Sequence, residues 1–154
     1  MVKFRLMSEE AFGTYKERLI EDYAKTLASN LKRSLEHTRI ASAEQINGLL
    51  KDGRHTKDHY VYEVVDAASE DVVGVLWVNI KQEEQRAFIF DIEMKKEQQG
   101  KGYGKAALTE LERLMKEMSV TKIGLNVFAD NPVAISLYQK AGYVVTNMNM
   151  VKEI

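Results

Sequence analysis

The sequence predicts an α+β fold with mixed helices and strands, and three patterns carry this prediction. Apolar residues recur at three- and four-residue steps in residues 12–27, 107–118 and 134–141, which is the spacing of amphipathic helices. Residues 59–94 instead alternate apolar and polar side chains and are rich in β-branched residues, as strands are. Only short polar turns interrupt this stretch, so its strands are expected to form an antiparallel meander.

Two helices are expected in the N-terminal region. Ser8 has the small oxygen-bearing side chain of an N-cap, and the helix that it opens runs to about Leu31. Ser42 and Gln45 stand three residues apart, in the form of a capping box. They predict a second, shorter helix that Gly53 ends, because glycine commonly follows a helix C-terminus.

Four strands are expected in the first two thirds of the chain, over residues 2–6, 59–65, 72–80 and 86–94. Regular alternation in the last of these would divide its side chains between two faces. One face would carry Phe88, Phe90, Ile92 and Met94, and the other Ile89, Asp91 and Glu93.

The C-terminal part is expected to continue with a helix, a strand, a helix and a strand. The first helix holds the apolar stripe of residues 107–118, and the strand covers residues 121–128. Asn131 and Pro132 are typical N-cap and first-turn residues of the next helix. The last strand runs from Tyr143 to about residue 152. We expect residues 1–154 to form a single domain.

Composition narrows the class of protein. Of the 154 residues, 45% are hydrophobic and 29% charged, which is typical of a soluble globular chain. The net charge is −1 and the basic residues are dispersed, so no nucleic-acid partner is indicated. With no cysteine, disulfides, thiolate metal sites and a covalent cysteine intermediate are excluded, and the histidines lack metal-ligand spacing. Without a signal-peptide core or membrane-spanning stretch, a cytoplasmic protein with no membrane partner is expected.

The most informative segment is Gln99-Gly100-Lys101-Gly102-Tyr103-Gly104, between a predicted strand and a predicted helix. Its three glycines permit positive φ angles and close approach of a ligand to the backbone. The first N–H groups of the following helix have no intrahelical partner, and the helix dipole adds positive potential there. The segment is therefore suited to bind a pyrophosphate, and Lys101 and Lys105 would add charge.

Spacing separates the phosphate motifs that compete for this loop. A Walker A loop has Ser or Thr after its Gly-Lys pair, where this chain has Ala106. A dinucleotide fingerprint has a third glycine where this chain has Lys105, and it belongs to a parallel sheet. The pattern that remains is Gln-x-x-Gly-x-Gly, matched by Gln99, Gly102 and Gly104. A glycine-rich turn without a ligand is the alternative.

A second motif lies about thirty residues further on. Residues 131–143 match the pattern Asn-x-x-Ala-x-x-Leu-Tyr-x-x-x-Gly-aromatic. With both motifs the chain resembles the GNAT superfamily of N-acetyltransferases, firmly from about Val72 to Tyr143 and only in topology before that. The resemblance implies a central mixed sheet of six to seven strands, an antiparallel meander followed by β-α-β-α-β, with helices on both faces. Relatives usually end in a β-hairpin, for which the residues after Tyr143 leave little room.

The resemblance also implies acetyl-CoA as the cofactor. The backbone of Ile92, Glu93 and Met94 would bind its pantetheine arm, in a V between this strand and residues 121–128. The backbone N–H groups of the glycine loop would hold the pyrophosphate, from Gln99, Gly100, Lys101, Gly102, Tyr103 and Gly104. Asn131 would touch the cofactor near the pantetheine.

Direct transfer of an acetyl group to an amine requires three tasks: proton removal from the ammonium, stabilisation of an oxyanion and protonation of the thiolate. By resemblance Tyr138 would point at the sulfur and protonate the thiolate, and the Met94 N–H would meet the oxyanion. Glu93 is the candidate general base, with Asp91 and ordered water as alternatives. Tyr138 could instead be a core aromatic, and either acid a solvated group.

These expectations lead to an acetyl-CoA-dependent N-acetyltransferase that transfers an acetyl group to a primary amine of a small molecule or protein. The acceptor stays open, as does the choice between monomer and homodimer. The alternative is a non-catalytic acyl-CoA sensor or interaction module on the same fold.

Overall fold

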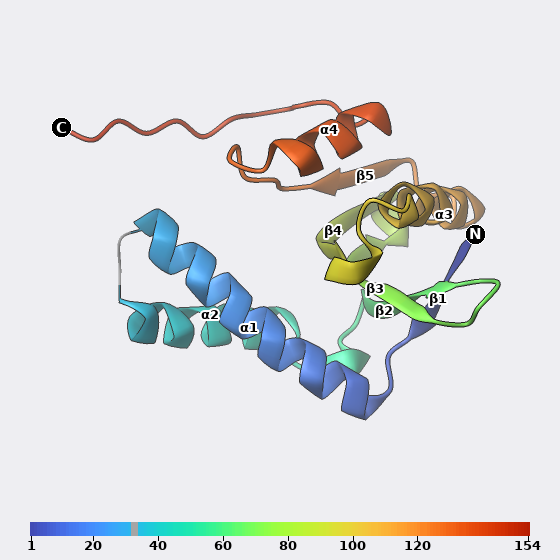
Figure 1. Cartoon of the computed structure of the whole chain (residues 1–154), viewed down its shortest axis with the longest axis horizontal. Coiled ribbons are helices and arrows are strands. Elements are labelled where there is room, and N and C mark those ends of the chain that lie inside the picture. The colour runs from blue at the N-terminus through green and yellow to red at the C-terminus, as the bar shows by residue number, and fades with distance from the viewer. Residues whose placement is uncertain (32–33) are drawn as a thin grey trace.

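A computed structural model describes residues 1–31 and 34–154 (Figure 1). In these residues five strands form one sheet in the order β1-β2-β3-β4-β5. The first four strands pair antiparallel, which confirms the meander predicted for residues 59–94, and the last pair is parallel. The strands are β1 (Val2–Leu6), β2 (His59–Asp66), β3 (Val72–Lys81), β4 (Arg86–Met94) and β5 (Lys122–Leu125).

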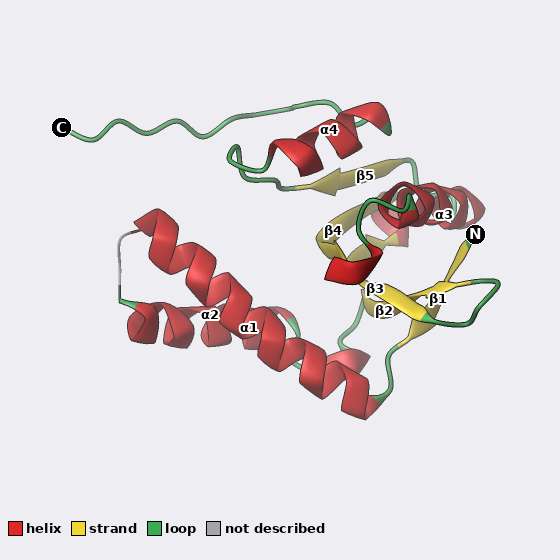
Figure 2. Cartoon of the chain, in the orientation of Figure 1, coloured by secondary structure: helices red, strands yellow, loops and turns green. Residues whose placement is uncertain are grey.

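The predicted placement of helices on both faces of the sheet is confirmed. Figure 2 shows one helical pair below the strands and the other two helices above them. The lower pair is α1 (Glu9–Leu31) and α2 (Leu35–Leu49), and the upper helices are α3 (Tyr103–Glu117) and α4 (Pro132–Lys140).

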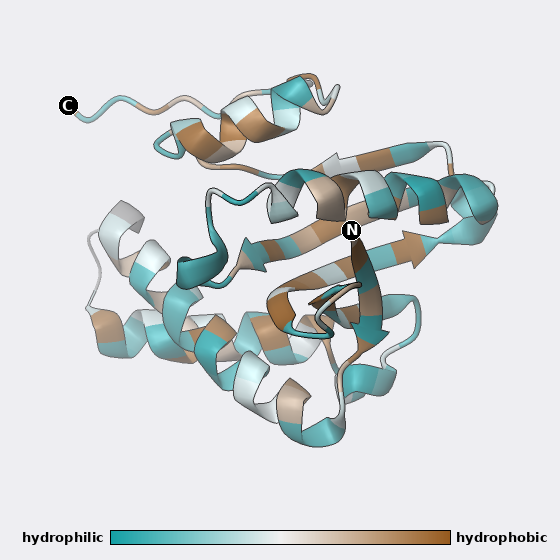
Figure 3. Cartoon of the chain, turned by 45° about the vertical axis from the view of Figure 1, so that its right-hand side comes forward, coloured by the Kyte–Doolittle hydropathy of each residue, from teal (hydrophilic) through white to brown (hydrophobic). Residues whose placement is uncertain are grey.

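Each face of the sheet has its own core. On one face α3 buries Ala107, Leu108, Leu111 and Met115 against the strands, which is the stripe predicted from the sequence. On the other face Trp77 packs with residues of α1 and α2. Figure 3 shows the apolar strands enclosed by helices whose outer sides are hydrophilic.

The second helix begins earlier than predicted. Its N-cap is Ser34, whose Oγ accepts a hydrogen bond from the His37 N–H, and α2 ends before Gly53. Ser42 lies inside α2, fully buried, and its hydroxyl donates to the Ile20 carbonyl of α1 at 2.8 Å. The capping-box interpretation was wrong, because Ser42 lies between α1 and α2 and its hydroxyl bonds the α1 backbone instead of capping a helix.

The predicted division of β4 into two faces is correct only in part. The register shifts between Trp77 and Val78 of β3, so that Trp77 is opposite Asp91 and Val78 is opposite Ile89. Phe90 is the extra residue of a β-bulge, and its ring stacks on Trp77 with centroids 4.7 Å apart. The alternation of side chains between the two faces is therefore interrupted at the bulge. Ile89, predicted on the opposite face, lies with Ile92 and Met94 in the α3 core.

The predicted sheet of six to seven strands is not found. Residues 143–152, expected to form the last strand, are extended but belong to no strand. A strand requires a neighbour for its backbone groups, and no described segment lies in register with this one. Within residues 1–31 and 34–154, β5 is therefore an edge of the sheet.

A substitution at Gly74 tests how tightly β3 holds the end of β4. A Cβ atom at Gly74 would lie 2.5 Å from the Glu93 carbonyl oxygen and 2.7 Å from the Met94 sulfur. We expect Gly74→Ala to lower the free energy of unfolding by about 1–3 kcal/mol in urea denaturation. The matched control is Gly13→Ala in α1, where no atom lies within 4 Å, and which should raise stability by about 0.5–1 kcal/mol. Equal stability of Gly74→Ala and the parent chain would contradict the packing described.

Candidate active site

The sheet opens between β4 and β5. The two strands pair only from Arg86 to Ile89 on β4, where Ile89 lies opposite Leu125. β4 then continues to Met94, whereas β5 ends at Leu125, short of the predicted Phe128. The last five residues of β4 thus have β3 on one side and no strand of the described chain on the other. The resemblance predicts a V-shaped opening at this place, where the pairing of β4 with β5 ends.

Alternation along β4 decides which backbone groups face this opening. The Lys95 N–H donates to the Val73 carbonyl of β3 at 2.8 Å. Because successive residues of a strand direct their N–H and C=O groups to opposite sides, those of Ile92 and Met94 face the opening and those of Glu93 face β3. The Gln99 side chain donates to the Met94 carbonyl at 3.2 Å, which ties the glycine loop to the end of β4.

The glycine loop has the conformation that its sequence predicts. Gly100 and Gly102 have φ angles of 76° and 87°, which favour glycine, and Gly102 is the N-cap of α3 without a side-chain cap. No hydrogen-bond acceptor within residues 1–31 and 34–154 takes the N–H groups of residues 100–104. These donors and the N-terminal end of the α3 dipole lie beside the opening, as an anion site requires.

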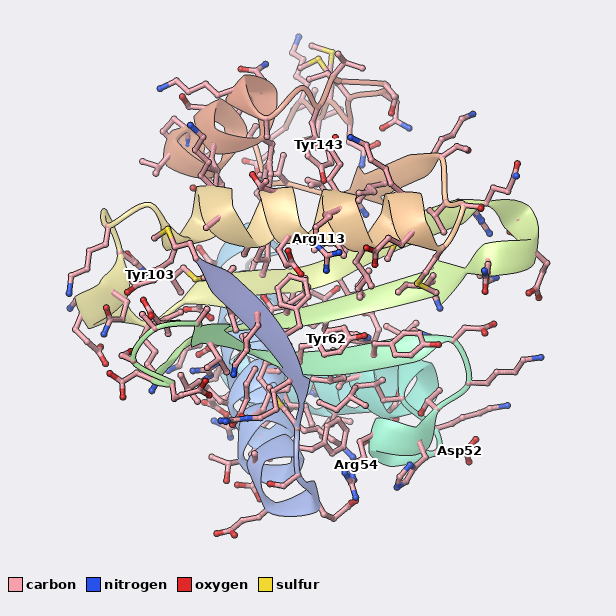
Figure 4. All side chains as sticks on the ribbon, turned by 90° about the vertical axis from the view of Figure 1, so that its right-hand side faces the viewer. Asp52, Arg54, Tyr62, Tyr103, Arg113 and Tyr143 are labelled. Carbon is pink, nitrogen blue, oxygen red and sulfur yellow. The ribbon has the colours of Figure 1, made fainter. Side chains whose placement is uncertain are left out.

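A side-chain hydrogen bond fixes this loop to the rest of the sheet. The Tyr103 hydroxyl donates to the Asp66 carboxylate at 2.6 Å, and Figure 4 shows Tyr103 beside the strands. This bond and backbone N–H donors from Ser69 and Ala68 hold the pKa of Asp66 at about 2. The sequence predicted that only the backbone of Tyr103 takes part in the site. The hydrogen bond of its side chain was not predicted, because Asp66 lies 37 residues away in the sequence and no local pattern links the two residues.

The second motif forms the helix on the far side of the opening. Asn131 is the N-cap of α4, as predicted, and its side chain accepts from the Ala134 N–H at 3.2 Å. Tyr138 is half-buried, packs against the α3 core and contacts the Tyr143 ring. Burial raises the pKa of Tyr138, and the charge of Asp91 adds to this effect. The phenol therefore keeps its proton at neutral pH and can donate it.

The two acids of β4 occupy different environments. Asp91 is half-buried and accepts a 2.7 Å hydrogen bond from the Tyr15 hydroxyl of α1. Burial raises the pKa of Asp91 to about 6, although the Tyr15 hydrogen bond lowers it. The Glu93 side chain is 52% exposed and lies 4.0 Å from the Arg18 guanidinium.

Asp91 thus has a pKa suited to a group that exchanges protons near neutral pH. Tyr15 belongs to the apolar stripe of α1 in the sequence, and nothing there marks it as the partner of an acid.

Comparison with known proteins agrees with this geometry. The acetyltransferase (GNAT) family matches residues 17–143. The chain is 31% identical, over 96% of each sequence, to an uncharacterized N-acetyltransferase, YycN, of Bacillus subtilis (strain 168). A crystal structure of YycN matches this chain with a TM-score of 0.92 and 29% identity, and the match covers 100% of this chain and 99% of the YycN chain. PaiA N-acetyltransferase of Thermoplasma acidophilum, whose structure is a complex with coenzyme A, shares the fold with a TM-score of 0.69 and 22% identity. This match covers 97% of this chain and 93% of the PaiA chain.

The chain therefore belongs to the GNAT acetyltransferase family, as its two motifs predict. Its fold is the mixed α+β fold of that family, with five strands in the described residues. No helix within residues 1–31 and 34–154 is long and apolar enough to cross a membrane.

The raised pKa of the half-buried Asp91 carboxyl predicts a pH dependence of stability. Its pKa is about 6 in the fold and about 3.9 in an unfolded chain, so the folded state binds more protons between these values. The contribution of Asp91 to stability is present below pH 4 and is lost as the pH rises through 6. Asp91→Asn should therefore gain roughly 1–3 kcal/mol relative to the parent chain between pH 4 and 7 in urea unfolding.

Glu93→Gln is the control for this measurement, because it removes the same charge from an exposed position on the same strand. We expect its stability relative to the parent chain to change much less over this pH range. A constant difference between Asp91→Asn and the parent chain from pH 4 to 7 would contradict the raised pKa.

Proposed function

We propose that this protein is an acetyl-CoA-dependent N-acetyltransferase that transfers an acetyl group directly to a primary amine of a small molecule or protein. The observation that carries the proposal is the end of pairing between β4 and β5 beside the N–H groups of residues 100–104, which have no acceptor within residues 1–31 and 34–154. The coenzyme A complex of PaiA, a protein with the same fold, supports this choice of cofactor.

The residues at the opening fit the chemistry of coenzyme A. Its amide-containing pantetheine arm can lie along β4 like a further strand, with Ile92 and Met94 offering their backbone groups. The N–H groups of residues 100–104 suit a pyrophosphate, with positive charge from Lys101 and Lys105. When bound, acetyl-CoA supplies an acetyl thioester that is already activated toward an amine. Asn131, the N-cap of α4, would lie near this arm.

Three groups of the chain then accept a proton, stabilise the developing negative charge and donate a proton. Asp91 takes a proton from the acceptor ammonium, since its pKa of about 6 leaves most of it ionised at pH 7. The Met94 N–H faces the opening and donates to the oxyanion. Tyr138 protonates the departing thiolate. Tyr15 holds the Asp91 carboxylate, and Glu93 with Arg18 lines the exposed side of the same strand.

Binding of acetyl-CoA is the first expected outcome. A ligand at one hundred times its dissociation constant stabilises a fold by about 2.7 kcal/mol, which a thermal shift detects readily. We expect acetyl-CoA and coenzyme A to raise the melting temperature and adenosine to leave it unchanged. No shift at millimolar acetyl-CoA would mean that residues 99–104 form only a turn.

Turnover separates the enzyme from a non-catalytic sensor. Thiol release should be measured with acetyl-CoA and a panel of amines, polyamines and peptides. We expect Asp91→Asn to lower kcat/KM by about 10²–10⁴-fold and Tyr138→Phe to lower kcat at nearly unchanged acetyl-CoA affinity. Activity of the parent chain should rise with pH through about 6, the pKa of Asp91.

Glu93→Gln is the matched control, with an expected loss of less than about fivefold, because an exposed acid contributes little to proton transfer. A larger loss in Glu93→Gln than in Asp91→Asn would reverse the assignment of the base. Acetyl-CoA binding without turnover on any acceptor would instead support the sensor.

A further inference from the structure

One aromatic side chain of β4 lies at the surface beside the proposed base. The Phe90 ring stacks on the buried Trp77 ring with centroids 4.7 Å apart, and the rings of Phe88 and His59 lie 4.9 and 5.6 Å away. Yet 38% of Phe90 is exposed. Three rings therefore hold Phe90 in place, while part of its apolar surface stays in contact with water, which is unfavourable.

The β-bulge places this ring next to Asp91 on one face of the sheet. Phe90 and Asp91 together lie opposite Trp77 of β3, as the two residues of a bulge share one partner. Phe90 stacks on Trp77, and Asp91 bonds Tyr15, which packs in the same core as Trp77. In a regular strand two successive side chains would point to opposite faces. Here an exposed ring and a carboxyl are neighbours on the same face.

This face borders the opening between β4 and β5. Pairing ends where Ile89 lies opposite Leu125, and Phe90 is the next residue of β4. The chain that follows β5 at this point carries two more exposed apolar side chains, Val127 at 40% and Phe128 at 54%. An acceptor that enters beside the end of pairing therefore meets apolar side chains from β4 and from the chain after β5.

The charges around Asp91 leave room for one ammonium group and an apolar body. Besides partial burial and a hydrogen bond, the charges of Glu93, Arg18 and Asp22 affect the pKa of Asp91, in that order. Glu93 and Arg18 lie 4.0 Å apart and offset each other. A second ammonium on the acceptor would find Glu93 already beside a guanidinium, whereas an apolar group finds the exposed part of Phe90.

We propose that the acceptor is a primary amine with an aromatic group one or two carbons from its nitrogen, and that Phe90 selects it. This inference rests on the proposed function, because it names the acceptor of the same site. The ammonium meets Asp91 while the aromatic group stacks on Phe90, an arrangement that favours ring pairs. Adjacent residues have Cα atoms about 3.8 Å apart, so a short linker joins the two contacts. The bound ring also removes exposed apolar surface from water.

A comparison of acceptors measures this preference. Thiol release with acetyl-CoA is followed for 2-phenylethylamine, for ethylamine, which lacks the ring, and for spermidine, which carries further ammonium groups instead. We expect kcat/KM for 2-phenylethylamine to exceed that for either other amine by at least about tenfold, because a pocket that fits an apolar group discriminates to this extent.

Phe90→Leu tests the contact itself, because leucine keeps an apolar side chain and lacks the ring. We expect the ratio of kcat/KM for 2-phenylethylamine to that for ethylamine to fall about three- to tenfold, with the KM of acetyl-CoA unchanged. The ratio compares two acceptors on one variant, so it does not depend on the folded fraction. Phe4→Leu is the matched control: Phe4 stacks on Tyr62 at the β1 edge, with centroids 5.4 Å apart, and the ratio should stay that of the parent chain.

The outcomes distinguish this inference from the proposed function. Turnover of ethylamine or spermidine at least as efficient as that of 2-phenylethylamine, or an unchanged ratio in Phe90→Leu, would overturn the choice of acceptor and leave the acetyltransferase in place. A parent chain that releases no thiol with any amine would overturn both.

Discussion

The site depends on the point at which hydrogen bonding between β4 and β5 ends. Each of the two strands has another partner: β4 pairs with β3, and β5 packs on the α3 core through Ile123 and Leu125. Pairing stops at Ile89, yet β4 continues to Met94, so backbone donors and acceptors remain available in the middle of the molecule. Gln99 and Tyr103 then fix the glycine loop at the mouth of this opening, through Met94 and Asp66.

The β-bulge at Phe90 has a second consequence for the same strand. It allows Ile92 and Met94 to continue the α3 core, while Asp91 is turned toward α1 and meets Tyr15. A half-buried carboxyl thereby lies beside the opening and accepts a hydrogen bond from the Tyr15 hydroxyl, and partial burial raises its pKa to about 6. The extra residue Phe90 thus turns Asp91 toward α1, and the partial burial of Asp91 there raises its pKa.

Local signals predicted most of the fold. The bounds of β4, the N-cap at Asn131 and the positive φ of Gly100 follow from the side chains themselves. Non-local contacts were missed. Ser42 matches a capping box but is used at a helix crossing, and the bonds of Asp91 to Tyr15 and of Asp66 to Tyr103 join residues far apart in sequence. The last strand, predicted over residues 143–152 from its alternation, is not found, because a local pattern does not show whether a neighbouring strand is there to pair with it.

The central claim is that the open edge of β4 and the glycine loop together bind acetyl-CoA. Backbone amide NMR during titration with acetyl-CoA tests it most directly. The account predicts that the largest shifts fall on Ile92, Met94 and residues 100–104, with little change for the amides of β1. Large shifts elsewhere with these amides unchanged, or no shifts at saturating ligand, would contradict it.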